Sequence, residues 1–258
     1  MASVHSSNQM DKWLVWPKLR GRAALRLFCF PYAGSGASIY RSWEDGLPPQ
    51  VHLCRVQLPG REGRLGEEPF TSLAPLLQIL LQAVDPFLDL PFAFFGHSMG
   101  ALIAFELARQ LRRHKNKQPI HLFMSGRGAP QLQAKYQAVL NESEEGLVKR
   151  LRRLRWTPRE ILKNRELMQL ILPTLRADYA VCDSYVYQVE EPLDCPLSVF
   201  GGEQDDKVSY DDLSAWREQT SGAFSIHILS GNHFFLHQSR VSLLRAIGEE
   251  LGTLSKDG

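Results

Sequence analysis

Residues 92–108 read FAFFGHSMGALIAFELA, and this stretch decides the fold. The apolar run Phe92–Phe95 predicts a short buried strand, and the helix-forming residues from Met99 onward predict a helix. The residues between them match the G-x-S-x-G pattern of a sharp strand-to-helix turn, which exposes a serine hydroxyl in a cleft. Gly96 and Gly100 leave the space that such a turn needs. An incidental glycine-serine turn is the alternative, and the flanking strand and helix argue against it.

Short apolar runs alternate with helical patterns on both sides of this stretch. Because continuous apolar strands separated by helices indicate βαβ units, the sequence predicts an α/β fold with a mostly parallel sheet and helices on both faces. The other strands are expected at 25–30, 51–58, 120–125, 197–200 and 224–229, and the helices at 75–84, 99–113 and 236–251.

Residues 127–187 break this alternation because they contain no good strand. Helical patterns occur at 144–154, 158–163 and 166–179, and the region is too long for a plain connection. We interpret it as a helical insertion that caps one end of the sheet. A helical hairpin with a purely structural role is the alternative.

Composition places the chain among ordinary globular proteins. It has 258 residues, 44% of them hydrophobic, and a net charge of +2, which disfavours a dedicated nucleic-acid binder. We expect a flexible N-terminal tail at 1–20 and one domain at 21–258. No run of about 18 apolar residues or secretory signal is present, so no membrane segment is expected. The four cysteines form no CxxC pair, which argues against zinc and indicates reduced thiols in a cytoplasmic protein.

A serine hydroxyl needs a base to become a good nucleophile, and the strand-turn-helix motif predicts the chain order serine, acid, histidine. With Ser98 as nucleophile, His233 is the preferred base, because it lies in a loop between the last predicted strand and the final helix. His237 is one helical turn further on and is expected to pack.

The acid is expected in the loop after the preceding strand. Asp205 is the first choice and Asp206 the reserve, since both follow the strand that ends at Phe200. Asp178 and Asp183 lie in the helical insertion and fit the chain order less well. The acid would hold the histidine in the productive tautomer and stabilise its charged form.

An oxyanion needs hydrogen-bond donors that are already in place. One donor is expected from the amide of Met99, directly after the nucleophile, and the second from the glycine-rich loop 30–36.

Six motifs together resemble the type II thioesterases of the α/β-hydrolase superfamily. These stand-alone enzymes serve polyketide synthases, nonribosomal peptide synthetases and animal fatty acid synthase. The resemblance covers 25–251, and the segments 57–61 and 172–179 are more specific to this family than GHSMG. The motifs are FPYAGSGA (30–37), QLPGREGR (57–64), GHSMGALIAFELA (96–108), LPTLRADYAVCDSY (172–185), FGGEQDDKV (200–208) and GNHFF (231–235).

The resemblance implies an α/β-hydrolase fold with a helical lid at about 127–187. It also implies that the substrate is an acyl thioester on the phosphopantetheine arm of a carrier protein, cleaved for editing or for product release without a metal or bound cofactor. The implied site residues are Ser98, His233 and Asp205 for catalysis, with the backbone amides of Ala33 and Met99 as the oxyanion hole.

Carrier proteins are usually acidic, and basic clusters at 109–117 and 149–155 are candidate docking surfaces, with solvated helix faces as the alternative. A monomer without nucleic-acid or membrane partners is expected. Two other functions stay open: a general carboxylesterase or lipase on the same fold, and a non-catalytic binding module.

Overall fold

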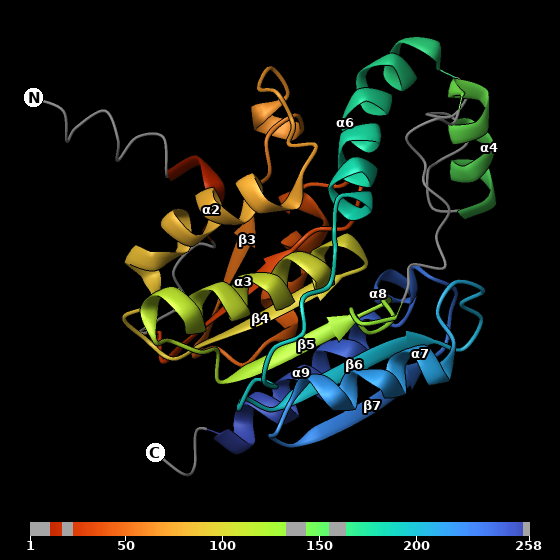
Figure 1. Cartoon of the computed structure of the whole chain (residues 1–258). Coiled ribbons are helices and arrows are strands. Elements are labelled where there is room, and N and C mark those ends of the chain that lie inside the picture. The colour runs from red at the N-terminus through yellow and green to blue at the C-terminus, as the bar shows by residue number, and fades with distance from the viewer. Residues whose placement is uncertain (1–10, 17–22, 133–142, 155–163, 255–258) are drawn as a thin grey trace, which may run out of the picture.

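A seven-stranded sheet occupies the centre of the computed structural model, which describes residues 11–16, 23–132, 143–154 and 164–254 (Figure 1). The spatial order is β1-β3-β2-β4-β5-β6-β7, and every neighbouring pair is parallel except β1 with β3. The predicted, mostly parallel α/β sheet is confirmed. Its strands are β1 (Leu14–Val15), β2 (Leu25–Phe30), β3 (Val51–Val56), β4 (Phe92–His97), β5 (His121–Ser125), β6 (Leu197–Gly202) and β7 (Phe224–Leu229).

Helices cover the sheet, and the helices of the insertion between β5 and β6 project away from it (Figure 1). The described α-helices are α2 (Leu73–Val84), α3 (Met99–Lys115), α4 (Glu144–Leu154), α6 (Arg165–Asp183), α7 (Tyr210–Ser214), α8 (Phe235–Gln238) and α9 (Arg240–Leu254). The described 3-10 helices are η1 (Asp11–Trp13), η2 (Ala37–Gly46), η3 (Glu62–Arg64), η4 (Asp85–Phe87) and η5 (Ala215–Gln219).

Two apolar cores lie on opposite faces of the sheet, because successive residues of a strand point to opposite sides. In β2, Phe28 and Phe30 pack into the core that includes α2 and α3. The alternate residues Leu27 and Cys29 pack into the core that includes η2 and α9. Burial on both faces explains why the strand is apolar without alternation.

Residues 11–15 differ from the expectation of a flexible tail through residue 20. Leu14 pairs with Val56 in an antiparallel register, so β1 adds an edge strand to the sheet. Trp13 and Leu14 are buried, and the Arg64 guanidinium lies 4.2 Å from the centre of the Trp13 ring. The stretch Asp11–Val15 is too short to signal a strand by itself, and β3 supplies the hydrogen bonds that make it one.

The expected final helix at 236–251 is two helices. The first, α8, ends at Gln238, and α9 begins at Arg240. The Ser239 hydroxyl donates to the Ser230 carbonyl oxygen at 2.6 Å, which ties the break to the loop after β7. This contact is between residues nine positions apart, and the apolar periodicity of the segment carries no sign of it.

The insertion between β5 and β6 contains α4 and α6, at the positions predicted at 144–154 and 166–179. The two helices stand side by side beyond the sheet (Figure 1), and Leu147 and Leu151 of α4 share an apolar cluster with Met168 and Leu172 of α6. The predicted helix at 158–163 lies outside the described residues. Part of the apolar face of each helix is thus buried against the other helix, and Val181 of α6 packs into the core of the main domain.

Candidate active site

Ser98 stands in the sharp turn between β4 and α3. Its φ of +53° is a conformation that residues with a side chain adopt only where the surroundings enforce it. The turn is crowded: a Cβ on Gly96 would lie 2.1 Å from the Gly100 carbonyl oxygen, and a Cβ on Gly100 would lie 2.1 Å from the Phe30 carbonyl oxygen. Both glycines of the motif are therefore steric requirements.

Strand β2 ends beside this turn. Phe30 is in register with Gly96, so the residues after Phe30 begin next to the segment that carries Ser98. They form a β-turn in which the Ser35 amide donates to the Tyr32 carbonyl oxygen at 3.0 Å. The loop that the sequence singled out for an oxyanion donor is thus a defined turn at the elbow.

Two backbone amides near Ser98 have no acceptor in the described part of the chain. One belongs to Met99, the first residue of α3, where helix amides lack intrahelical acceptors. The other belongs to Ala33, which precedes Gly34 at the corner of the β-turn. Amides of this kind, with the positive end of a helix dipole behind one of them, suit a developing negative charge.

The loops after β6 and β7 bring an acid and a histidine together. Asp205 Oδ2 lies 2.8 Å from His233 Nδ1, and the Asp205 side chain is fully buried. An ionised carboxylate only accepts hydrogen bonds, so the Nδ1–H of His233 donates and Nε2 is left for another group. The second carboxylate oxygen of Asp205 accepts from the Lys207 amide at 2.8 Å, which fixes the carboxylate plane.

Gln204 joins these two loops, and sequence reasoning missed this role. Its side-chain oxygen accepts from the Gly231 backbone amide at 2.7 Å, and its backbone amide donates to the Gly231 carbonyl oxygen at 2.9 Å. Gln204 stands next to Asp205 and Gly231 stands two residues before His233. The pairing therefore sets the spacing between the acid and the histidine.

His97 lies between the acid–histidine pair and the elbow. The His97 ring lies 5.2 Å from the His233 ring, centre to centre, and His97 directly precedes Ser98. Burial, followed by the nearby His233 and His237, holds the pKa of His97 well below its usual range. His97 therefore stays neutral, and its Nδ1 is 2.9 Å from the Ser125 hydroxyl.

A match to a family model accompanies these features: a strained serine, an acid–histidine pair, and two amides that lack an acceptor among the described residues. The model of the thioesterase domain matches residues 25–251. The chain belongs to the thioesterase family. It is a thioester hydrolase, and the resemblance found in the sequence motifs is confirmed.

Relatives with similar sequences and structures extend over nearly the whole chain. The gramicidin S biosynthesis protein GrsT of Aneurinibacillus migulanus is 45% identical over 244 residues, covering 95% of each chain. The type II thioesterase BorB from the borrelidin biosynthetic cluster superposes with a TM-score of 0.84 at 34% identity, covering 93% of this chain and 98% of BorB. RedJ, a thioesterase of prodiginine biosynthesis in Streptomyces coelicolor, gives a TM-score of 0.84 at 39% identity, with coverages of 88% and 91%.

The two adjacent aspartates of this thioesterase have different surroundings. Asp205 is buried against His233, whereas the Asp206 side chain is 61% exposed and lies 3.6 Å from the Lys207 ammonium. The structure thus brings the first choice of the sequence analysis, and not the reserve, to the histidine. Asp178 and Asp183 are on α6.

His237, the histidine expected to pack, faces the β-turn that contains Ala33. Its Nε2 lies 3.0 Å from the Tyr32 hydroxyl. Burial, helped by the positive charge of Arg240, lowers the pKa of His237 to about 4. The ring is therefore neutral at neutral pH, and it contacts the side chain of Tyr32, the first residue of the turn.

The insertion helices of the thioesterase place apolar side chains over the same turn. Ala33 packs against the cluster formed by α4 and α6, which includes Leu172 and Leu175. A Cβ on Gly34 would lie 3.0 Å from Leu175 Cδ1. Apolar side chains of the insertion therefore pack against one side of the turn that contains the Ala33 amide.

Other chemistries find little support in the described residues. No group of three or more potential metal ligands occurs among them, and none of their helices is both long and apolar enough to span a bilayer. All four cysteines are free thiols, and burial raises the pKa of Cys195 to about 12. Such thiols are poor nucleophiles.

Proposed function

We propose that this thioesterase hydrolyses acyl groups from the phosphopantetheine arm of a carrier protein, with Ser98 as nucleophile, His233 as base and Asp205 as the acid that orients it. The observation that carries the proposal is the 2.8 Å contact between buried Asp205 and His233 beside the strained serine turn. The names of the relatives, which belong to antibiotic and related biosynthetic pathways, support a carrier protein as the source of substrate.

In the acylation step, the Ser98 oxygen attacks the thioester carbonyl carbon while its proton passes to His233 Nε2. The carbonyl oxygen becomes an oxyanion, for which the Ala33 and Met99 amides are the proposed donors. When the carbon–sulfur bond breaks, His233 returns the proton to sulfur and the carrier leaves as a free thiol. Asp205 remains ionised and stabilises the charged imidazole throughout this step.

In the deacylation step, water attacks the acyl-Ser98 ester and gives a proton to His233. The same amides hold the second oxyanion. The ester bond then breaks, the Ser98 oxygen takes the proton back, and the acyl group leaves as a carboxylic acid. Editing of stalled chains and release of finished product use this same sequence of bonds. No metal or bound cofactor takes part in the proposed reaction.

The helices α4 and α6 are proposed to form the lid over the acyl chain. Their shared cluster is apolar and continues to Ala33, so a bound chain would replace hydrocarbon contacts with similar ones. The proposed lid would also keep water from the acyl-enzyme until the carrier arm has left. We further propose that the protein acts as a monomer in the cytoplasm, where carrier proteins are loaded.

The two basic clusters differ as docking surfaces for an acidic carrier. The cluster at 149–155 has most of its side chains outside the described residues, and its docking role stays a prediction. Charge reversal at Arg152 and Arg153 tests it, and unchanged turnover and salt dependence would contradict it. The cluster at 109–117 is largely paired within the chain, through Arg109–Glu190, Arg112–Glu190, Arg113–Glu190 and Lys115–Asp85.

The function is tested by hydrolysis of a panel of acyl groups loaded on one carrier protein, with Ser98→Ala as the control. We expect faster release from the carrier than from simple oxygen esters of the same acyl groups, and a loss of about 10⁴-fold or more in Ser98→Ala. A fluorophosphonate should label the parent and not Ser98→Ala. Equal or faster hydrolysis of oxygen esters would favour a general carboxylesterase, and absence of labelling would favour a binding module.

A further inference from the structure

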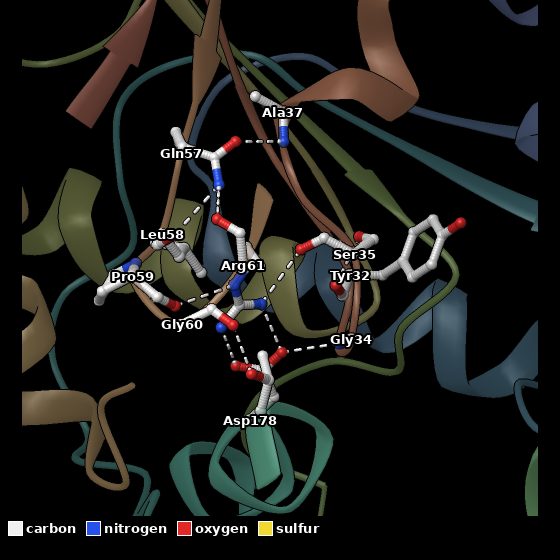
Figure 2. A network of polar contacts seen from close by, with 11 residues as sticks. Tyr32, Gly34, Ser35, Ala37, Gln57, Leu58, Pro59, Gly60, Arg61 and Asp178 are labelled. Atoms are coloured by element: carbon white, nitrogen blue, oxygen red, sulfur yellow. Dashed lines mark hydrogen bonds and ion pairs between the residues drawn. The ribbon is translucent and has the colours of Figure 1, made fainter. Parts of the chain in front are cut away.

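A buried ion pair joins helix α6 to the loop after β3. Arg61 Nη1 and Nη2 lie 2.6 and 2.7 Å from the two carboxylate oxygens of Asp178, so the pair is bidentate (Figure 2). The two side chains are only 7% and 3% exposed. Both residues belong to the motifs at 57–64 and 172–185, to which the sequence analysis assigned no role.

The same pair holds the β-turn that contains Ala33. Asp178 Oδ2 accepts from the Gly34 amide at 2.7 Å, and Arg61 Nη1 donates to the Ser35 carbonyl oxygen at 3.1 Å (Figure 2). Gly34 has a φ of +77°, as the third residue of a type II turn requires. Type I and type II turns differ by a flip of their central peptide, and the bond from Asp178 keeps that peptide in one orientation.

The loop that carries Arg61 is itself braced. Arg61 Nε donates to the Pro59 carbonyl oxygen at 3.1 Å, and Gln57 Nε2 donates to the Arg61 carbonyl oxygen at 3.2 Å. On α6, the Thr174 hydroxyl donates to the Gly60 carbonyl oxygen at 2.6 Å. The guanidinium therefore has little freedom to follow Asp178 if the helix moves.

We propose that Asp178 and Arg61 are positioning residues that hold the type II turn of residues 32–35, and through the shape of that turn the Ala33 amide, for the oxyanion over Ser98. This rests on the proposed function, since it assumes that Ala33 supplies one oxyanion donor. Asp178 lies on the same helix as Leu172 and Leu175, which face the apolar cluster. The helix that covers the acyl chain thereby also sets the geometry of the donor.

A purely structural role accounts poorly for this arrangement. Buried ion pairs are a weak source of stability, because the loss of hydration offsets their attraction. Here the carboxylate bonds to the amide next to the proposed donor, and the guanidinium bonds to the next residue of the same turn. Both charged groups therefore bond to the turn that carries one of the two proposed oxyanion donors.

The test compares four variants with the parent: Asp178→Ala, Asp178→Asn, Arg61→Lys and, as the matched control, Glu106→Gln. Glu106 also forms a buried carboxylate–arginine pair, 2.7 Å from Arg109, but within α3 and not with the turn. Three quantities are measured on folded protein, below the melting transition: kcat and KM for a carrier-bound thioester, and Kd for a trifluoromethyl ketone, which forms a tetrahedral oxyanion with Ser98.

We expect kcat to fall about 10- to 100-fold in Asp178→Ala, with KM changed less than about threefold, since a displaced donor weakens the transition state more than the substrate complex. Affinity for the trifluoromethyl ketone should fall in proportion to kcat. Asp178→Asn keeps an acceptor for the Gly34 amide and should lose less than Asp178→Ala. Arg61→Lys loses the bidentate geometry and should also lower kcat. Glu106→Gln should lower Tm without changing kcat.

The inference is overturned if Asp178→Asn and Arg61→Lys melt earlier but keep kcat and ketone affinity within twofold of the parent. If Asp178→Ala does not fold, the asparagine and lysine variants decide by the same criterion. Failure of the proposed function has a different signature, because Ser98→Ala would then remain active or the parent would not hydrolyse the carrier thioester at all.

Discussion

The two amides that we propose for the oxyanion hole are held by opposite means. The Met99 amide belongs to the elbow, where Gly96, Ser98 and Gly100 shape the backbone within five consecutive residues. The Ala33 amide belongs to a turn whose orientation depends on Asp178, which is 144 residues from Gly34 along the chain. One donor is thus set by local sterics and the other by a long-range contact to the lid.

This difference indicates how the site would respond to perturbation. The elbow is packed backbone against backbone, so it can only remain intact or fail with the fold. The Ala33 turn rests on side chains, which can shift when α6 shifts. Four predictions, ordered from the largest expected effect to the smallest, test the elbow around Ser98 and the turn around Ala33.

The largest effect should come from the pair that activates the serine, because neither amide matters without an attacking nucleophile. Asp205→Asn should lower kcat by about 10⁴-fold, since an asparagine favours the wrong tautomer of His233. Asp206→Asn is the matched control and should change kcat by less than about twofold, because its carboxylate is largely exposed. Steady-state kinetics on carrier-bound substrate measure both. A larger loss in Asp206→Asn would move the acid role to the second aspartate.

Gly100→Ala should destabilise the elbow around Ser98. The added Cβ would lie 2.1 Å from the Phe30 carbonyl oxygen and 2.9 Å from the Pro31 carbonyl oxygen, and neither backbone atom can move without distorting β2. We expect a loss of about 3 kcal/mol or more in the free energy of unfolding, measured by urea denaturation. Gly63→Ala, where a Cβ would meet nothing within 4 Å, should stay within about 0.5 kcal/mol of the parent.

Gly34→Ala should strain the turn that contains Ala33 and leave the fold intact. Its φ of +77° costs an alanine about 1–2 kcal/mol, while the nearest atom to the new Cβ is the flexible end of Leu175 at 3.0 Å. We expect the free energy of unfolding to fall by this amount, about 1–2 kcal/mol. We also expect kcat to fall about tenfold, because a strained turn displaces the Ala33 amide. A stability loss equal to that of Gly100→Ala would contradict the contrast between the elbow and the turn.

Low pH should destabilise the protein at the Ala33 turn, because His237 contacts Tyr32 there as a neutral ring. Its pKa is lowered from 6.5 to about 4 in the folded chain, so between these pH values the unfolded chain binds a proton that the folded chain does not. Stability from this group is therefore fully present above pH 6.5 and is lost as pH falls toward 4, by on the order of 1 kcal/mol for a half-buried ring. His237→Gln should flatten the pH dependence of urea unfolding. His121, whose pKa burial also lowers to about 4, leaves a background slope.

Strand positions were predictable because burial on both faces leaves continuous apolar runs in the sequence. The elbow was predictable because its requirement for glycine is local. The strand at Leu14–Val15 and the break at Ser239 were not, since each depends on hydrogen bonds to a distant partner, Val56 or Ser230. Arg61 and Asp178 stood in recognisable motifs, but nothing in either motif indicated that the two side chains meet.

The sequence by itself determined the α/β order of elements, the strained Ser98 turn and the loops that carry Asp205 and His233, because these follow from steric and apolar patterns between near neighbours. Only the tertiary structure decided that Asp205 and not Asp206 faces the histidine, and that Asp178 holds the turn of Ala33. The reason is physical: a carboxylate bonds to whichever donor the packing brings within about 3 Å, and packing is a property of the whole chain.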